Sequence, residues 1–269
     1  MMTGKFGVEL ECFNVRQDVV AKALNDNGIP AKVASYSGSD YSVFQVKADG
    51  SIQGQNGFEV VSPVLEGEEG IMIMRKVCKI LADLNAQVNK STGFHIHHNV
   101  RTWGIAEFRN LYKRFVKFET GLDAVQPASR RGSANKYCGS MYGTFTPSAE
   151  VQNTIFQKLD TCRTVRQLSE MYRTRYLKLN LQSFFRMGSV EFRNHSGTFD
   201  ADKVENYIRL TFGMVQDAQD HVAVQKFTAD FTAQVALDTL LQGLVRRNRI
   251  TKEVAKYYKD RAVALKGVA

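Results

Sequence analysis

The sequence predicts an α+β fold built around a largely antiparallel sheet, on two observations. The predicted elements follow the order β-α-β-β-α-β-α-α-β-β-α-α-α, which lacks the regular alternation of a parallel α/β sheet. The composition, with 43% hydrophobic and 23% charged residues, is that of a globular chain. Collagen-like, coiled-coil and largely disordered classes are therefore excluded.

Regular hydrophobic patterns predict the elements of the first half of the chain. Residues 5–13 alternate between apolar and polar side chains, as a strand does. Asn14 with Gln17 forms an expected capping box, and the helix that follows it ends at Gly28. The elements predicted next are strands near 42–48 and 57–62 around the Asp49-Gly50-Ser51 turn, a helix over 66–88, a strand over 93–100 and a helix over 104–124.

The stretch 126–149 is irregular and basic. It is rich in Gly, Ser, Tyr and Arg, lacks periodicity, and is longer than most connecting loops. Two interpretations remain open. The stretch is either a flap, whose Arg130 and Arg131 close on phosphates or on an acidic acceptor, or a solvated basic loop.

Helices and two strands account for the rest of the chain. The predicted elements are a helical region over 151–172, strands over 174–182 and 188–195, and helices over 202–224, 227–245 and 251–265. No linker or internal repeat divides the sequence. We therefore expect a single catalytic domain over 1–269, in which about 225–269 form a helical C-terminal extension.

The net charge does not identify a binding partner, whereas the cysteines indicate the cellular compartment. The formal net charge is +9, but the basic residues are spread along the chain, so charge alone does not select nucleic acid, a membrane surface or a phosphate-bearing substrate. The four cysteines are widely spaced and form no CxxC pair, as expected for buried thiols in a reducing compartment. No run approaches the roughly 18 apolar residues of a membrane span, and no signal peptide is visible. These features predict a cytoplasmic protein with no membrane partner.

Several predicted strands place polar side chains on one face. Residues two apart in a strand share a face, so Glu9 and Glu11 lie on one face of their strand, and His95 and His97 lie on one face of theirs. A half-solvated antiparallel sheet also alternates in this way, which is the alternative interpretation for any one strand. The other residues predicted on such faces are Glu191, Arg193 and His195 in the last strand, and Tyr176, Lys178, Asn180 and Gln182 in the strand before it.

This set of side chains favours a hard divalent cation and an anionic ligand. Carboxylates and imidazoles without thiolates suit Mg²⁺ or Mn²⁺ better than structural zinc. Arg193 and Lys178 on the same face would repel a cation unless phosphate oxygens lay between them, which points to phosphoryl transfer. Because no Walker A loop and no GxGxxG fingerprint is present, a nucleotide would bind on the sheet.

Five motifs follow one another along the chain: GVELE at 7–11, GFEVVSP at 57–63, TGFHIHHNV at 92–100, RYLKLN at 175–180 and GSVEFRNHSGTFD at 188–200. As an ordered set they resemble the motifs of the predicted amidoligases, in the carboxylate–amine ligase superfamily of glutamine synthetase and glutamate–cysteine ligase. The resemblance implies a curved, mostly antiparallel sheet packed with helices on one side, like the catalytic domain of glutamine synthetase. Its concave face would hold ATP and Mg²⁺ or Mn²⁺.

The resemblance also implies roles for individual residues. Arg193 would clamp a phosphate or a substrate carboxylate, and Lys178 and Asn180 would line the substrate end. His95 would lie near the metal and the phosphates, and His97 near the nucleotide. Independently of the resemblance, the flap interpretation of the stretch 126–149 adds Arg130 and Arg131 as phosphate contacts. The implied metal ligands are Glu9, Glu11, Glu59, His95 and Glu191.

The function expected from these features is ATP-dependent amide bond formation through an acyl phosphate, with small-molecule or peptide carboxylates and amines as substrates. Only eight residues precede Glu9, so we expect a site built mainly within one chain, and the sequence does not predict the oligomeric state. Two alternatives remain. One is a metal-dependent hydrolase in which the Glu/His cluster activates water. The other is a basic nucleic-acid-binding module, although no recognisable binding motif is present and nucleic acid is not the expected partner.

Overall fold

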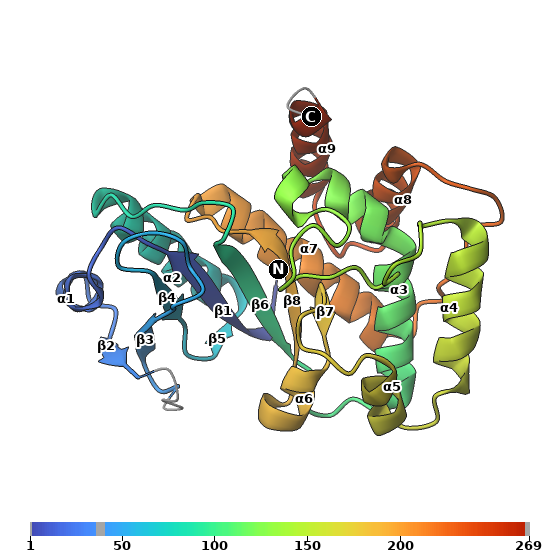
Figure 1. Cartoon of the computed structure of the whole chain (residues 1–269), viewed down its shortest axis with the longest axis horizontal. Coiled ribbons are helices and arrows are strands. Elements are labelled where there is room, and N and C mark those ends of the chain that lie inside the picture. Colours follow the sequence, from blue (N-terminus) through green and yellow to red (C-terminus); the bar gives the residue numbers. More distant parts are fainter. Residues whose placement is uncertain (1, 36–40, 267–269) are drawn as a thin grey trace. The chain divides into compact units, whose positions relative to one another are not determined.

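The computed structural model describes residues 2–35 and 41–266, drawn in Figure 1. These residues form two compact units. Unit 1 comprises the described residues up to Asn99 together with His195–Ile208, and unit 2 comprises Val100–Asn194 and the described residues from Arg209 onward. Strand β8 (Ser189–Ser196) and helix α7 (Ala201–Gln219) each contribute residues to both units.

The sheet of unit 1 is mostly antiparallel, as predicted. Its strands lie in the order β2-β3-β4-β1-β6, and the short β5 also pairs with β1. Every pair is antiparallel except β2 with β3. The strands are β1 (Lys5–Cys12), β2 (Ala31–Ala34), β3 (Phe44–Ala48), β4 (Phe58–Val61), β5 (Leu65–Glu66) and β6 (Gly93–Asn99).

Alternation along β1 separates an apolar face from a polar one. Val8 and Leu10 are fully buried, while Glu9 between them points to the other face. Helix α2 (Gly67–Asp83) covers the apolar face, because a Cβ on its Gly70 would lie 3.0 Å from the ring of Phe6. The helix α1 (Gln17–Asp26), blue in Figure 1, also belongs to this unit. The carboxylates of β1 therefore lie on the face opposite α2.

The predicted capping box before α1 is wrong. Asn14 has a left-handed backbone with a φ of 77°, and the N-cap residue is Arg16, whose side chain binds Asp18 instead of the helix N-terminus. The predicted end of the helix is confirmed, since α1 ends before Gly28, whose φ is 74°. Strand β2 was not predicted.

Unit 2 is largely helical, and α3 and α8 form its centre. A Cβ on Gly121 of α3 would lie 2.4 Å from the backbone nitrogen of Leu237 in α8, so this glycine permits the close approach of the two helices. The elements are α3 (Ile105–Ala124), a 3₁₀ turn η1 (Ala128–Arg130), α4 (Ala149–Thr161), α5 (Val165–Met171), β7 (Leu179–Asn180), α6 (Gln182–Met187), β8, α7, α8 (Ala233–Arg246) and α9 (Lys252–Lys266).

Four predictions in unit 2 differ from the structure, among them the helix predicted over 227–245, which begins only at Ala233 as α8. The predicted helix over 151–172 is two helices, because the side chain of Thr164 caps a second one, α5. The predicted strand over 174–182 is reduced to the two residues of β7, and α6 follows it directly. Gly188, with a φ of 70°, ends α6 and leads into β8. The helix predicted over 202–224 ends at Gln219.

Two further expectations concern the whole described chain. All four cysteines, Cys12, Cys78, Cys138 and Cys162, are buried free thiols, as predicted. Among residues 2–35 and 41–266, no helix has both the length and the apolar character needed to cross a membrane.

Candidate functional site

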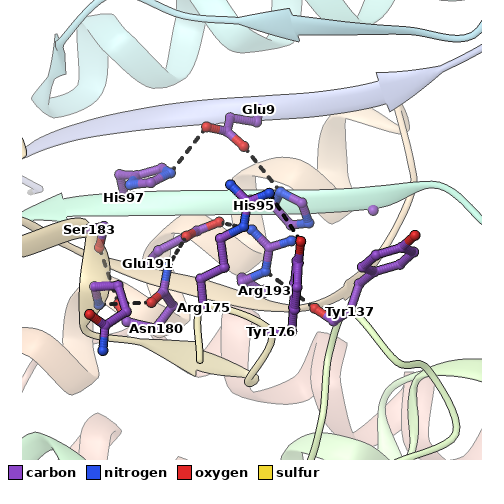
Figure 2. Close-up of polar contacts among 12 residues, drawn as sticks. Glu9, His95, His97, Tyr137, Arg175, Tyr176, Asn180, Ser183, Glu191 and Arg193 are labelled. Atoms are coloured by element: carbon purple, nitrogen blue, oxygen red, sulfur yellow. Dashed lines mark hydrogen bonds and ion pairs between the residues drawn. The ribbon is translucent and has the colours of Figure 1, made fainter. Parts of the chain in front are cut away.

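The centre of the polar face in unit 1 is Glu9, which lies between two imidazoles. In the antiparallel register of β1 and β6, Glu9 is opposite His95, and Gly7 is opposite His97. Glu9 Oε2 lies 3.2 Å from Nδ1 of His95, and Oε1 lies 3.3 Å from Nε2 of His97 (Figure 2). The period-two pattern of both strands therefore brings these three residues together, as the sequence indicated.

Two more carboxylates lie on the same strands or their neighbours. Glu11 is opposite Glu59 in the register of β1 and β4, and its Oε1 is 3.6 Å from Nε2 of His95. Its other oxygen accepts a hydrogen bond of 2.6 Å from the backbone N–H of Gly93. The structure thus places four of the predicted metal ligands, namely Glu9, Glu11, Glu59 and His95, on three adjacent strands of unit 1.

The electrostatics of these carboxylates differ sharply. Burial alone would raise the pKa of Glu9, but the hydrogen bonds and charges of His95 and His97 outweigh it and hold the pKa well below its usual value. Burial, and then the negative charges of Glu9, Asp49 and Glu11, raise the pKa of Glu59 to about 8. Like charges therefore crowd around Glu59, and a nearby cation would relieve their repulsion.

Lys47 is a member of this region that the sequence reasoning missed. It lies opposite Glu59 in the register of β3 and β4 and is 5% exposed. Its positive charge opposes the rise in the pKa of Glu59. The signal was available, because Gln45 and Lys47 alternate with Phe44 and Val46 and so share the polar face of a predicted strand.

The other two histidines near the motifs are core residues. His98 is 1% exposed, and burial together with the charge of His97 lowers its pKa to about 3. His195 is also 1% exposed and packs against the rings of Phe94 and Tyr207, at centroid distances of 5.3 and 4.7 Å. The interpretation of His98 as a core residue is confirmed, whereas His195 packs among aromatic rings in unit 1.

In unit 2, Glu191 is held by the side chains of Asn180 and Arg193. Asn180 and Glu191 are opposite each other in the β7–β8 register, and Nδ2 of Asn180 donates a hydrogen bond of 2.6 Å to Glu191 Oε2. Arg193 Nη1 pairs with the other oxygen, Oε1, while its Nε donates to the backbone oxygen of Tyr137 at 3.3 Å (Figure 2). These contacts fix both oxygens of Glu191.

Lys178 lies elsewhere, in a buried triad with Glu119 and Asp123 of α3. Its Nζ lies 2.8 Å from Glu119 Oε1 and 2.6 Å from Asp123 Oδ2, and its side chain has 0% exposure. The predicted alternation fails here because β7 begins only at Leu179. This placement favours a positioning role for Lys178 over contact with a substrate.

The charges within the triad are tightly coupled. Burial lowers the pKa of Lys178, but the two carboxylates outweigh burial and raise it above its usual value. Burial also raises the pKa of Asp123 to about 6, although Lys178 opposes that rise. Sequence reasoning missed Glu119 and Asp123; their spacing of four residues on the buried side of α3 was the available signal.

The segment 126–149 is tied to the rest of unit 2. The backbone N–H of Gly132 donates to Asp123 Oδ2 at 2.7 Å, and that of Met141 donates to Glu119 Oε2 at 2.9 Å. Arg130 is 3% exposed. Arg131 donates to the backbone oxygens of Gln126 and Leu265, at 2.8 and 3.4 Å. Closure of either arginine on a ligand would therefore require these contacts to rearrange.

Comparison with known proteins adds a family and two solved structures. The family model described as "Putative amidoligase enzyme" matches residues 3–215. A bifunctional glutathione synthetase from Pasteurella multocida is 13% identical, with a TM-score of 0.47, over 98% of this chain and 47% of that chain. A glutamine synthase homologue is 12% identical, with a TM-score of 0.49, over 98% of this chain and 66% of that chain. The chain thus spans about half the length of the first structure. No curated protein matches it.

Proposed function

The chain belongs to the amidoligase family, and from this premise we propose that it is an ATP-dependent carboxylate–amine ligase that forms an amide bond through an acyl phosphate. One observation carries the proposal. Glu9 lies between His95 and His97, next to the crowded carboxylates Glu11 and Glu59. Such a set can hold cations that neutralise a triphosphate.

The donor set fits Mg²⁺ or Mn²⁺. It consists of carboxylate oxygens and an imidazole, without a thiolate, and the repulsion that raises the pKa of Glu59 would be relieved by a cation. We propose Glu9, Glu11, Glu59 and His95 as ligands in unit 1, and the motif resemblance adds Glu191. When bound, the ion supplies positive charge that screens the phosphate oxygens.

Other side chains would bind the nucleotide and the substrate. In this proposal His97 contacts the nucleotide, and Arg193, fixed by Glu191 and the backbone of Tyr137, offers a guanidinium to a phosphate or to the substrate carboxylate. Asn180 holds Glu191 in place. Arg130 and Arg131 remain proposed phosphate contacts that depend on rearrangement of the segment 126–149.

The proposed reaction has two steps. An oxygen of the substrate carboxylate attacks the γ-phosphorus of ATP, the bond to the β–γ bridging oxygen breaks, and ADP leaves. The lone pair of an unprotonated amine then attacks the acyl carbon, phosphate leaves with the bonding electrons, and the amine nitrogen loses its proton. Positioning and charge screening supply most of the acceleration, because both substrates are anionic.

The test is an assay of ADP release together with product mass. The protein is incubated with Mg²⁺, ATP and pools of amino acids, short peptides and polyamines. We expect ADP and an amide product only when a carboxylate, an amine and ATP are all present. Hydrolysis of amides without ATP would contradict the ligase and support a metal-dependent hydrolase.

A further inference from the structure

An exposed basic and aromatic cluster lies beside Glu191 and Arg193 in unit 2. It consists of Lys136 and Tyr137 from the segment 126–149, and Arg175 and Tyr176 from the stretch before β7. We propose that this basic aromatic cluster binds the side-chain carboxylates of an acidic peptide, which is the carboxylate substrate. The role of the peptide as a substrate rests on the proposed function. Binding of the peptide to the cluster can be tested without it.

A short backbone pairing brings the two halves of the cluster together. The N–H of Gly139 donates to the backbone oxygen of Tyr176 at 2.8 Å, and the N–H of Lys178 donates to the backbone oxygen of Gly139 at 3.0 Å. The rings of Tyr137 and Tyr176 consequently meet edge to face, with centroids 5.3 Å apart. Because Lys178 is locked in the buried triad, this pairing is a fixed part of the fold.

Each tyrosine ring carries a cation. Nζ of Lys136 lies 4.8 Å from the centroid of the Tyr137 ring, and the guanidinium carbon of Arg175 lies 5.0 Å from that of Tyr176. Nη2 of Arg175 also donates to the Tyr176 hydroxyl at 3.1 Å. Lys136, Arg175 and Tyr176 are exposed, and Lys136 forms no ion pair with any residue that the structure describes.

The local potential is positive. The hydrogen bond and charge of Arg175, together with the charges of Arg193 and Lys136, lower the pKa of the Tyr176 phenol. Three cations from separate stretches of sequence therefore act on one exposed hydroxyl, and an anion at this surface would be attracted by all of them.

The cluster continues into the candidate site within the same unit. The backbone oxygen of Tyr137 accepts from Nε of Arg193, which in turn pairs with Glu191, and Figure 2 draws this chain of contacts. A ligand on the two rings would lie next to the residues that we assign to catalysis. A peptide fits this surface best, because the ring faces can contact its methylene groups while Lys136 and Arg175 bind its carboxylates.

Binding of a defined probe tests the cluster without ATP or turnover. The probe is dye-labelled tetraglutamate, titrated with the whole protein in an anisotropy assay, and tetraglutamine is the neutral comparison. We expect saturable binding of tetraglutamate only, and about tenfold weaker binding by Lys136→Gln/Arg175→Gln, which loses two exposed cation contacts.

The matched control removes two exposed cations elsewhere in unit 2, as Lys158→Gln/Arg163→Gln. We expect its tetraglutamate affinity to remain within about twofold of that of the unmodified protein. An equal loss of tetraglutamate affinity in both variants would show that only net charge matters and would overturn the proposal. Unchanged affinity in the cluster variant would overturn it too. A cluster variant that weakens ATP binding instead of peptide binding would assign the cluster to the nucleotide.

The two proposals fail separately. Tetraglutamate binding that depends on the cluster, in a protein that never releases ADP, would leave the cluster as an acidic peptide site and reject the ligase. The opposite outcome is ADP release that requires Glu9, with a KM for every acidic peptide that is unchanged in the cluster variant. That result would keep the ligase and reject the cluster as its substrate site.

Discussion

The ammonium of Lys178 contacts both carboxylate oxygens of Asp123, at 2.7 and 2.6 Å, inside unit 2. The same ammonium binds Glu119, and the two carboxylates also accept backbone N–H groups of Gly132 and Met141. One buried cation therefore joins α3, the start of β7 and the irregular segment 126–149. The carboxylates outnumber the cation, so the triad has no spare positive charge.

Removal of the Lys178 charge should lower the stability of the folded protein. We expect Lys178→Met to lower the free energy of unfolding by about 3–5 kcal/mol, because two buried carboxylates lose their partner while the volume is nearly kept. Urea denaturation followed by circular dichroism measures the change. Lys158→Met, at an exposed position of α4, is the control and should change stability by less than about 0.5 kcal/mol. A loss of similar size in both variants would contradict the role of the triad.

The pH dependence of stability should carry a signature of Asp123. Its pKa rises from 3.8 to about 6 on folding, so the folded protein binds this proton more tightly than the unfolded chain. The stability that the group contributes is therefore full below pH 3.8 and falls as the pH rises through about 6. We expect Asp123→Asn to remove this decline.

The measurement is the difference in unfolding free energy between the unmodified protein and Asp123→Asn at pH values across that interval. Other groups contribute slopes of their own, of the opposite sign for Glu9 with its lowered pKa and of the same sign for Glu59 with its raised pKa, and taking the difference cancels them. A difference that does not vary with pH would show that Asp123 titrates normally in the folded protein.

The sequence predicted the site residues correctly in long strands, but it did not predict contacts between residues that are far apart in the sequence. Strands β1 and β6 have eight and seven residues, enough for a period of two to place Glu9, Glu11 and His95 on one face. Strand β7 has two residues, so the same rule misplaced Lys178. The partners of that lysine are 59 and 55 residues away in the sequence, a distance at which no local pattern reports a contact.

Backbone conformation was a second cause of error. Asn14 followed by Gln17 has the residue types of a capping box, but the left-handed backbone of Asn14 moves the helix start to Gln17. Tertiary hydrogen bonds decide that conformation, since the N–H of Asn14 donates to the backbone oxygen of Gln55 and its side chain donates to that of Asn85. Neither partner is visible from residues 14–17.

The charge of Glu9 should be essential for the metal-dependent reaction. We expect Glu9→Gln, which keeps the shape of the side chain, to lower the rate of ADP formation at least about hundredfold. It should also raise the Mg²⁺ concentration for half-maximal rate by at least about tenfold. Glu66→Gln, at a side chain that is 62% exposed, is the matched control and should behave as the unmodified protein. Full activity of Glu9→Gln with an unchanged Mg²⁺ requirement would exclude Glu9 as a ligand.

The hydrogen bond from Asn180 to Glu191 gives the sharpest test of the arrangement in unit 2. Asn180→Asp would place two carboxylates at the 2.6 Å separation that the amide now occupies, so that one of them must take up a proton near neutral pH. We expect kcat/KM for ADP formation to fall at least about tenfold at neutral pH and to recover partly as the pH is lowered, because a shared proton restores the bond. Asn180→Ala removes the donor without adding charge, and its loss should be smaller and independent of pH. An aspartate tolerated at every pH would mean that Glu191 needs no donor at this position.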